Sequence, residues 1–324
     1  MLKVLLTDYA WPDLNIERAI LKDAGIELVV AEKSDPQSLA KLAADCDGIM
    51  TNWAKVSEPV IAASPRCKIV ARLGIGLDNI DVGFATSRGI VVTNVPDYCL
   101  VEVAEHALAL LLSMARKVAF YHYATQSGRY ELQAGPKLRR IEGQTLGIIG
   151  MGNIGRRLAE KAVGLQLRVL TTGRQRKTHQ ELPPGVTWCE MDELLSRVDY
   201  LSLHLPLAPE TKHLIGEAQL ARMKPSAYII NTARGGLIDH AALAAAVAAG
   251  KLAGAALDVQ DPEPPDLSKP PFNDPRVVVT PHAAFTSEES LENLRSRTAK
   301  QVAACLTGGL PENVVNPSVL AKKS

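Results

Sequence analysis

Three polar residues in the second half of the sequence are of the types needed to reduce a carbonyl group. Arg234 lies in "NTARGGLID", Glu263 in "LDVQDPEPP" and His282 in "TPHAAF". Hydride transfer to a 2-keto acid requires a proton donor at the carbonyl oxygen and a fixed cation for the carboxylate. Histidine titrates near neutral pH and can be the donor, a glutamate can orient the imidazolium, and the arginine fork matches a carboxylate. Each residue alone has a structural explanation, and only the combination predicts a catalytic set.

A glycine-rich motif lies ahead of these residues. In "GIIGMGNIG", Gly150, Gly152 and Gly155 follow an apolar run and open a helix-length segment. At this spacing the first glycine allows a tight turn, the second lets the backbone approach a pyrophosphate, and the third allows close helix–strand packing. The amides of Asn153 and Ile154 would lie at the positive end of the helix. The motif predicts a dinucleotide site, although a plain strand-to-helix turn can carry the same glycines.

The end of the next apolar run indicates which dinucleotide is bound. About 20 residues after the glycines, an NAD site normally offers an acid to the ribose 2′-hydroxyl. Here "RVLTTGRQRK" supplies Gly173, Arg174, Gln175, Arg176 and Lys177 instead, and an arginine can hold a 2′-phosphate through a charge-assisted fork. We therefore expect NADP(H) to be preferred, with NAD(H) as the alternative. A solvated basic loop is the structural explanation of the same residues.

The elements that would position these residues form two series. Short β-rich runs at 3–7, 26–30, 47–51, 68–72 and 90–94 predict five buried parallel strands. A second series begins at 145–150 and continues through "LRVLTT", "DYLSLHL", "AYIIN", "GAALDV" and "RVVVT". Helix-length segments separate the runs, so the fold class is α/β with two doubly wound parallel sheets. Each candidate residue then follows the carboxyl end of a strand, where open α/β sheets bind their ligands.

Two other segments are helical by their pattern. The segment 102–128 is apolar almost all round, which favours a helix buried in an interface. The segment after Ser287 is amphipathic and follows the last strand of the second series. We expect it to return to the first domain and complete it.

Composition narrows the classes of partner. The chain has 324 residues, 36 basic and 35 acidic, for a net charge of +1, so we expect neither a nucleic-acid nor a membrane partner. Five scattered cysteines without a CxxC pair argue against a disulfide framework and against a metal site. No run approaches a membrane span or a signal sequence, and a cytoplasmic protein is expected.

The successive motifs resemble one known family. "ARLGIGLDNID", "NVPDYCLVEVAEHAL", "GIIGMGNIG", "INTARGGLID", "LDVQDPEPP" and "TPHAAF" are similar to the signatures of the D-isomer-specific 2-hydroxyacid dehydrogenases. The resemblance implies a flavodoxin-like substrate domain of residues 1–99 plus 288–324 and a Rossmann nucleotide domain of residues 100–287. It also implies an active site in the cleft between them and a homodimer formed through the long helix.

The resemblance assigns substrate-binding residues as well. It implies that the amides of Ile75 and Gly76 join Arg234 in holding the carboxylate of a small 2-keto or 2-hydroxy acid. Asn52 is a further candidate because of its loop position. The wall of the substrate pocket is expected to include Tyr98, Cys99 and Leu100.

On the cofactor side, the resemblance implies that Asp258 and Ala284 lie near the nicotinamide carboxamide. The other positions assigned to the cofactor are Val103, His204, Pro206, Thr211, Thr232 and Ala233. Two histidines on the apolar segment, His106 and His122, are instead expected to pack or to face solvent.

Departures within the family leave two functions open. Formate dehydrogenases carry Gln where this sequence has Glu263. Because the sequence ends at Ser324, we expect it to lack the regulatory domain of many phosphoglycerate dehydrogenases. Several motifs are especially similar to the C-terminal-binding-protein branch, although that branch has Trp at the Phe285 position and an acid after the second nucleotide-domain strand. "TTGRQ" is instead similar to NADP-preferring glyoxylate/hydroxypyruvate reductases. The first function is an NADPH-dependent reductase of small 2-keto acids, and the alternative is a dinucleotide-sensing regulatory protein.

Overall fold

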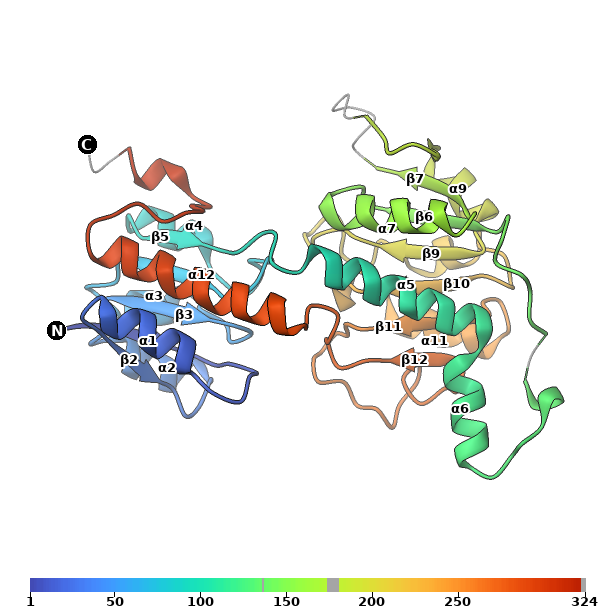
Figure 1. Ribbon diagram of the computed structural model, residues 1–324, viewed down its shortest axis with the longest axis horizontal. Helices are drawn as coiled ribbons and strands as arrows, with labels where there is room; N and C mark the ends of the chain where they lie inside the picture. The colour runs from blue at the N-terminus through green and yellow to red at the C-terminus, as the bar shows by residue number, and fades with distance from the viewer. Residues whose placement is uncertain (136, 174–180, 322–324) are drawn as a thin grey trace. The chain divides into compact units, whose positions relative to one another are not determined.

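The computed structural model describes residues 1–135, 137–173 and 181–321. The chain divides into two units, one of residues 1–98 with 287–324 and one of residues 99–286 (Figure 1). These boundaries differ by one residue from those expected from the sequence. Each unit is an α/β sandwich around a parallel sheet, as the alternating pattern predicted.

The first unit contains five parallel strands. They pair in the order β2-β1-β3-β4-β5, which is the flavodoxin-like order. Both faces of the sheet are covered, which explains why its strands read as continuous apolar runs in the sequence. The strands are β1 (Leu2–Leu6), β2 (Ile26–Val30), β3 (Gly48–Thr51), β4 (Ile69–Arg72) and β5 (Val91–Thr93).

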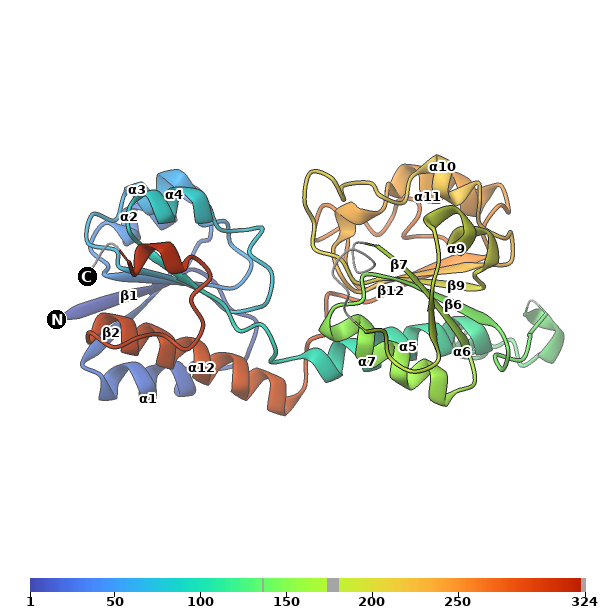
Figure 2. The same ribbon diagram turned by 90° about the horizontal axis from the view of Figure 1, so that it is seen from above.

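Helices cover the two faces of this sheet (Figure 2). One face carries α2 (Pro36–Ala43), α3 (Glu58–Ala62) and α4 (Val82–Ser87), and the other carries α1 (Asn15–Asp23) and α12 (Glu288–Leu306). Helix α12 does return to the first unit, as expected, and a short 3-10 helix, Pro317–Val319, follows it.

The return of α12 is fixed at its start and in its middle. The Ser287 hydroxyl accepts the Ser290 amide at 2.9 Å, and the Ser290 hydroxyl accepts the Ser287 amide at 2.8 Å, which caps the helix N-terminus. Further along, the Arg295 guanidinium donates to both carboxylate oxygens of Glu17 on α1 at 2.8 Å. Glu17 is fully buried, so this bidentate pair locks α12 against α1.

The second unit contains seven parallel strands in the order β12-β11-β10-β9-β6-β7-β8. The strand order reverses between β6 and β9, and in such sheets ligands bind outside the carboxyl ends of the strands at this switch point. Strand β8 was not predicted from the sequence. The strands are β6 (Thr145–Ile149), β7 (Arg168–Thr172), β8 (Val186–Trp188), β9 (Tyr200–Leu203), β10 (Tyr228–Asn231), β11 (Gly254–Leu257) and β12 (Val277–Val279).

The faces of this sheet carry two separate layers of helices (Figure 2). Helices α5 (Leu100–Arg116) and α7 (Asn153–Gly164) cover one face, and α9 (Met191–Arg197), α10 (Glu217–Leu220) and α11 (His240–Ala248) cover the other. Each layer contributes its own apolar core, one including Leu111 and Leu158 and the other Leu195 and Leu243. The described part of the unit also contains two 3-10 helices, Leu132–Ala134 and Gly235–Leu237.

The segment 102–128, expected as one helix, is two helices. Helix α5 ends at Arg116, and α6 (Val118–Gln126) starts after Lys117, whose φ of +57° is left-handed. The Lys117 ammonium lies 4.1 Å from the centre of the Tyr228 ring, and burial lowers its pKa to about 8. The cation–π contact draws this lysine into the unit. After Lys117, α6 is largely exposed within this chain although its sequence is apolar; Tyr123, for example, is 70% exposed.

Three further observations concern the membrane, metal and cysteine expectations. Across the described parts of the chain, none of the helices is long and apolar enough to cross a membrane. Nor do the described residues include a group of three or more His, Cys, Asp or Glu side chains placed to hold a metal ion. The five cysteines are thiols rather than disulfides, and four of them are buried.

Candidate active site

The three residues predicted as a catalytic set all follow the carboxyl ends of neighbouring strands of the second unit. Arg234 comes after β10, Glu263 after β11 and His282 after β12. Because β10, β11 and β12 are adjacent and parallel, their carboxyl ends lie at one edge of the sheet. The topology therefore gathers side chains that are up to 48 residues apart in the sequence.

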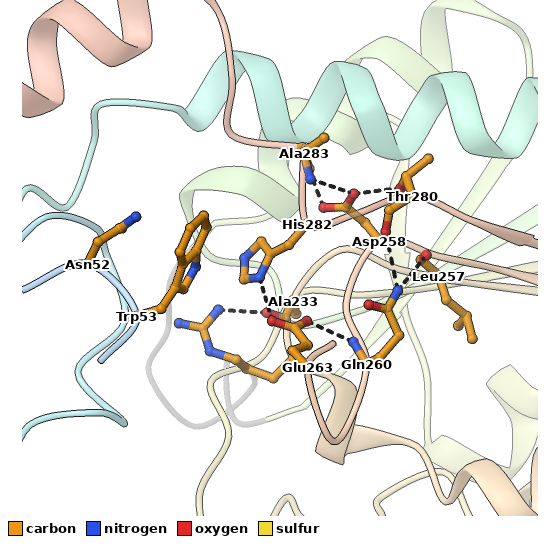
Figure 3. A network of polar contacts seen from close by, with 12 residues as sticks. Asn52, Trp53, Ala233, Leu257, Asp258, Gln260, Glu263, Thr280, His282 and Ala283 are labelled. Carbon is orange, nitrogen blue, oxygen red and sulfur yellow. Dashed lines mark hydrogen bonds and ion pairs between the residues drawn. The ribbon is translucent and has the colours of Figure 1, made fainter. Parts of the chain in front are cut away.

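His282 and Glu263 are in direct contact. The imidazole Nδ1 of His282 lies 2.9 Å from a Glu263 carboxylate oxygen, and Figure 3 shows the two side chains pointing toward each other. The other Glu263 oxygen accepts the backbone amide of Gln260 at 2.8 Å. Both side chains are partly exposed, at 25% for His282 and 32% for Glu263. The Gln260 amide thus fixes the glutamate carboxylate, which in turn orients the histidine ring through Nδ1.

The backbone around His282 is constrained. Its φ of +52° lies in the left-handed region, which costs free energy outside glycine and is kept only where the surroundings hold it. The His282 amide donates to the Asp258 carbonyl at 2.8 Å, and the Phe285 ring stands edge-on at 6.0 Å between ring centres. These contacts fix the direction in which the imidazole leaves the chain.

Arg234 occupies a tight turn after β10. The buried side chain of Asn231 accepts the Ala233 amide at 3.0 Å and donates to the Arg234 carbonyl at 2.8 Å, which shapes the turn. The Arg234 guanidinium donates to the Ala233 carbonyl at 2.7 Å. Next along the chain, a Cβ on Gly235 would lie 2.0 Å from the Gln260 carbonyl carbon. Only glycine allows this approach, which packs the Arg234 turn onto the loop that carries Glu263.

Asp258 organises the loop that carries His282. Its carboxylate is fully buried and accepts the Ala283 amide at 2.9 Å and the Thr280 hydroxyl at 2.5 Å (Figure 3). It also accepts the Ala284 amide at 3.0 Å. Burial raises the pKa of Asp258, but its hydrogen bonds, including one from His106, lower it by more. Its pKa consequently lies below the usual range.

His106 is therefore not the packing or surface residue expected from the sequence. Its Nε2 lies 3.1 Å from the Thr280 hydroxyl and 3.4 Å from the Asp258 carboxylate. The apolar residues around His106 in the sequence did not indicate a contact with Asp258, 152 residues further along the chain. The structure places this histidine directly behind the loop of His282.

The glycine motif forms the turn that the sequence predicted. Gly150 has a φ of +99°, and a Cβ there would lie 2.4 Å from the His204 carbonyl oxygen, while a Cβ on Gly155 would lie 2.2 Å from the Gly150 carbonyl oxygen. Gly152 caps α7, which begins at Asn153. The motif thus joins β6 to α7 at the switch point of the sheet.

The structure contains several features that fit a bound dinucleotide. A Cβ on Gly152 would meet nothing within 4 Å, so the start of α7 is open for a phosphate group. The Thr232 hydroxyl, at the end of β10, is buried and has no hydrogen-bond partner among the described residues. Burial lowers the pKa of His204 to about 4, so this imidazole, 2.9 Å from the Ser202 hydroxyl, is neutral near pH 7. The donors present therefore suit an anionic, hydrogen-bonding cofactor.

The remaining cofactor positions are distributed around the same edge of the sheet. Val103 on α5 and Ala284 are buried, and the Thr211 hydroxyl donates to the Pro206 carbonyl at 2.8 Å in the loop after β9. Ala233 lies in the Arg234 turn, Ile154 is in the first turn of α7, and Gly173 is exposed after β7 with a φ of +125°. Arg174 and Arg176 lie outside the described residues.

The substrate candidates of the first unit form a connected set of their own. The carbonyls of Ile75 and Gly76 accept the Asn94 amide group at 2.6 Å and the Arg72 guanidinium at 3.1 Å. Within the described chain, the amides of Ile75 and Gly76 donate to no protein acceptor. Both amides are therefore available to a ligand carboxylate.

Asn52 lies in a neighbouring loop of the same unit. Asp8, after β1, accepts the amides of Asn52 at 3.1 Å and Trp53 at 2.7 Å, which fixes the loop after β3. The Asn52 Oδ1 accepts from Arg72 at 3.2 Å, whereas its buried Nδ2 has no hydrogen-bond partner among the described residues. This unsatisfied donor is consistent with a polar ligand at the loop.

Fold and motif together define a class of protein. A Rossmann sheet with a glycine turn at its switch point is a nucleotide-binding architecture, and the second unit places an arginine, a glutamate and a histidine at the same sheet edge. The class is that of the nicotinamide-dependent dehydrogenases.

Comparison with known proteins specifies the family. Residues 108–284 match the NAD-binding domain of the D-isomer-specific 2-hydroxyacid dehydrogenases. A glyoxylate reductase of Korarchaeum cryptofilum is 39% identical over 85% of this chain and 84% of its own. A D-3-phosphoglycerate dehydrogenase of Methanocaldococcus jannaschii is 36% identical over the whole of this chain, which spans 61% of that relative's length.

Solved structures agree with this result. An NADPH-dependent glyoxylate/hydroxypyruvate reductase of Sinorhizobium meliloti, in complex with NADP and malonate, has a TM-score of 0.83 at 28% identity, covering 97% of this chain and 96% of its own. Other solved neighbours are complexes with NADPH and with NAD. The chain belongs to the D-isomer-specific 2-hydroxyacid dehydrogenase family. It is an oxidoreductase that acts on a CH–OH group with NAD or NADP.

Proposed function

We propose that the enzyme is an NADPH-dependent reductase of small 2-keto acids, of the glyoxylate/hydroxypyruvate type. The observation that carries the cofactor assignment is the end of β7, where Thr172 and Gly173 are followed by Arg174 and no acid. A 2′-phosphate is repelled by a carboxylate and bound by a guanidinium. The similarity to glyoxylate reductases supports the choice of a small substrate.

The catalytic roles follow from the contacts at the sheet edge. A nicotinamide bound at the glycine turn would supply the hydride. His282, oriented through Nδ1 by Glu263 at 2.9 Å, gives the proton from Nε2 to the carbonyl oxygen, so that the C=O bond becomes CH–OH and the histidine becomes neutral. Arg234 binds the substrate carboxylate, and the amides of Ile75 and Gly76 are further donors to it. Asp258 holds the loop that carries the proton donor.

A substrate panel tests this proposal. The purified enzyme is mixed with glyoxylate, hydroxypyruvate, pyruvate and larger 2-keto acids, with NADPH or NADH, and with D-3-phosphoglycerate and NAD or NADP for the reverse reaction. We expect turnover of the small keto acids and little turnover of the phosphorylated acid. Tight NADPH binding without turnover of any substrate would instead favour the dinucleotide-sensing regulatory protein.

The cofactor preference has its own test. Charge-assisted hydrogen bonds contribute about 1.5–3 kcal/mol, so the unmodified enzyme should favour NADPH over NADH by about 10- to 100-fold in kcat/KM. Arg174→Ala should remove most of that preference by lowering kcat/KM with NADPH and leaving NADH within about twofold. Raising the ionic strength should weaken NADPH binding more than NADH binding, because salt screens the attraction between a guanidinium and a phosphate.

A matched control is available on the same strand. Arg168 is exposed at the start of β7, the end away from the candidate cofactor site, and Arg168→Ala should leave the NADPH to NADH ratio unchanged. Introducing an acid at Gly173 is a poorer test, because its φ of +125° strains any side chain. A ratio that is the same in Arg174→Ala and the unmodified enzyme would identify the basic run as a solvated loop.

A further inference from the structure

We propose that His106 is a positioning residue for the proton donor, acting on His282 through Asp258 and Thr280. The proposal rests on the proposed function of His282 as donor. His106 belongs to α5 and touches neither Glu263 nor Arg234 in any contact described above. Its effect on the reaction would be transmitted entirely through the loop after β12.

The contacts form a short chain of polar groups. The His106 Nε2 lies 3.1 Å from the Thr280 hydroxyl and 3.4 Å from a carboxylate oxygen of Asp258. That same oxygen accepts the Thr280 hydroxyl at 2.5 Å and the Ala283 amide at 2.9 Å. His282 lies between Thr280 and Ala283 in sequence, so the carboxylate holds the backbone on both sides of the donor.

The donors to Asp258 come from two different parts of the chain, and this distinguishes His106 from the others. Thr280, Ala283 and Ala284 belong to the same short loop as His282, so their bonds to Asp258 move with that loop. His106 comes from α5, whose inner face packs into the core of the second unit at Ala107, Leu111 and Met114. It therefore joins the Asp258 carboxylate to a helix outside the loop, in addition to the bond that the Asp258 amide donates to the Asn231 carbonyl on β10.

Two energetic costs explain why such a contact is stabilising. A fully buried carboxylate is costly unless each oxygen is satisfied by hydrogen bonds. His282 is held at a φ of +52°, a conformation that persists only when the surroundings impose it. Without the His106 donor, the Asp258 oxygen that accepts from Thr280 and Ala283 would lose one of its partners. The loop that carries His282 would then be held less firmly. A displacement of about 1 Å at a catalytic group can lower a rate by about 10²-fold.

The test compares two substitutions of His106. His106→Ala should lower kcat by about 10- to 100-fold, with the keto-acid KM and the NADPH Kd changed by less than about threefold. His106→Gln should recover most of kcat, because the Gln amide nitrogen can occupy the place of Nε2 and donate to the same atoms. Leu108→Ala is the matched control, since Leu108 is also half-buried on α5 and packs on the same core without a polar partner. It should lower Tm but leave kcat nearly unchanged.

Hydrogen exchange separates this proposal from the assignment of function. In His106→Ala, the amides of Ala283 and Ala284 should exchange faster, with the rest of the second unit unaffected, and His106→Gln should restore their protection. If the unmodified enzyme reduces no keto acid but this exchange pattern holds, the proposed function fails and the positioning contact stands. If the enzyme is active and His106→Ala has normal kcat and normal exchange, the positioning role is overturned. An equal loss of kcat in His106→Gln or in Leu108→Ala would overturn it as well.

Discussion

Replacing His282 by asparagine is expected to lower kcat by about 10²–10⁴-fold, the range typical of losing a general acid. Asparagine can still accept or donate a hydrogen bond toward Glu263, and it tolerates the left-handed backbone at this position. It cannot give a proton at neutral pH. NADPH binding should therefore remain nearly intact, as measured by quenching of protein fluorescence or enhancement of cofactor fluorescence, while steady-state turnover collapses.

The control for this experiment is another histidine of the second unit. His122 is exposed on α6, and His122→Asn should behave like the unmodified enzyme in every assay. Circular dichroism and Tm establish that His282→Asn is folded. Near-normal turnover in a folded His282→Asn enzyme would show that another group supplies the proton.

The fold was predictable from the sequence to a large extent. Of the twelve strands in the described residues, eleven coincide with apolar runs that the sequence analysis identified, because strands buried on both faces leave little room for polar residues. Strand β8 was missed, since Val186–Trp188 is short, at the edge of the sheet and only partly buried. Edge strands need no continuous apolar run, so their sequences carry a weak signal.

The break between α5 and α6 could not be predicted by local rules. Lysine is a good helix former, and nothing in "MARKVAF" resembles a helix stop. The left-handed conformation of Lys117 accompanies its burial and its contact with Tyr228, a residue 111 positions further along the chain. Tertiary packing overrode the helix propensity at this residue.

The candidate site likewise contains residues that the sequence could group and one that it could not. Arg234, Glu263 and His282 could be grouped from the sequence because each follows a predicted strand, and the contact of His282 with Glu263 is present in the structure. His106 could not be grouped with them, since its position on an apolar helix indicated packing. Its partners, Thr280 and Asp258, become neighbours only because α5 packs against the sheet face at β10 and β11. The role of the basic run after Gly173 stays a prediction from the sequence.

Arg234→Ala is expected to raise the keto-acid KM and to lower kcat together, with a loss of about 10²–10³-fold in kcat/KM. The reason is that a guanidinium paired with a carboxylate in a partly buried site contributes about 2–5 kcal/mol to binding and orientation. Arg234→Lys should recover only a small part, because an ammonium keeps the charge but cannot form the two parallel hydrogen bonds of the fork. Steady-state kinetics of both variants with glyoxylate or pyruvate provide the measurement.

A neutral substrate shows whether the arginine recognises the carboxylate or serves another purpose. The unmodified enzyme should strongly prefer a 2-keto acid to its amide, since the amide leaves the guanidinium without an anionic partner. In Arg234→Ala the ratio of kcat/KM for the acid to that for the amide should fall toward one. Added guanidinium ion should restore part of the activity with the keto acid but none of the activity with the amide. Arg222→Ala, on an exposed arginine paired with Asp192 in the same unit, is the matched control and should retain the full preference. If Arg234→Ala loses kcat/KM equally for the acid and the amide, the residue shapes the turn around Gly235 rather than binding the carboxylate.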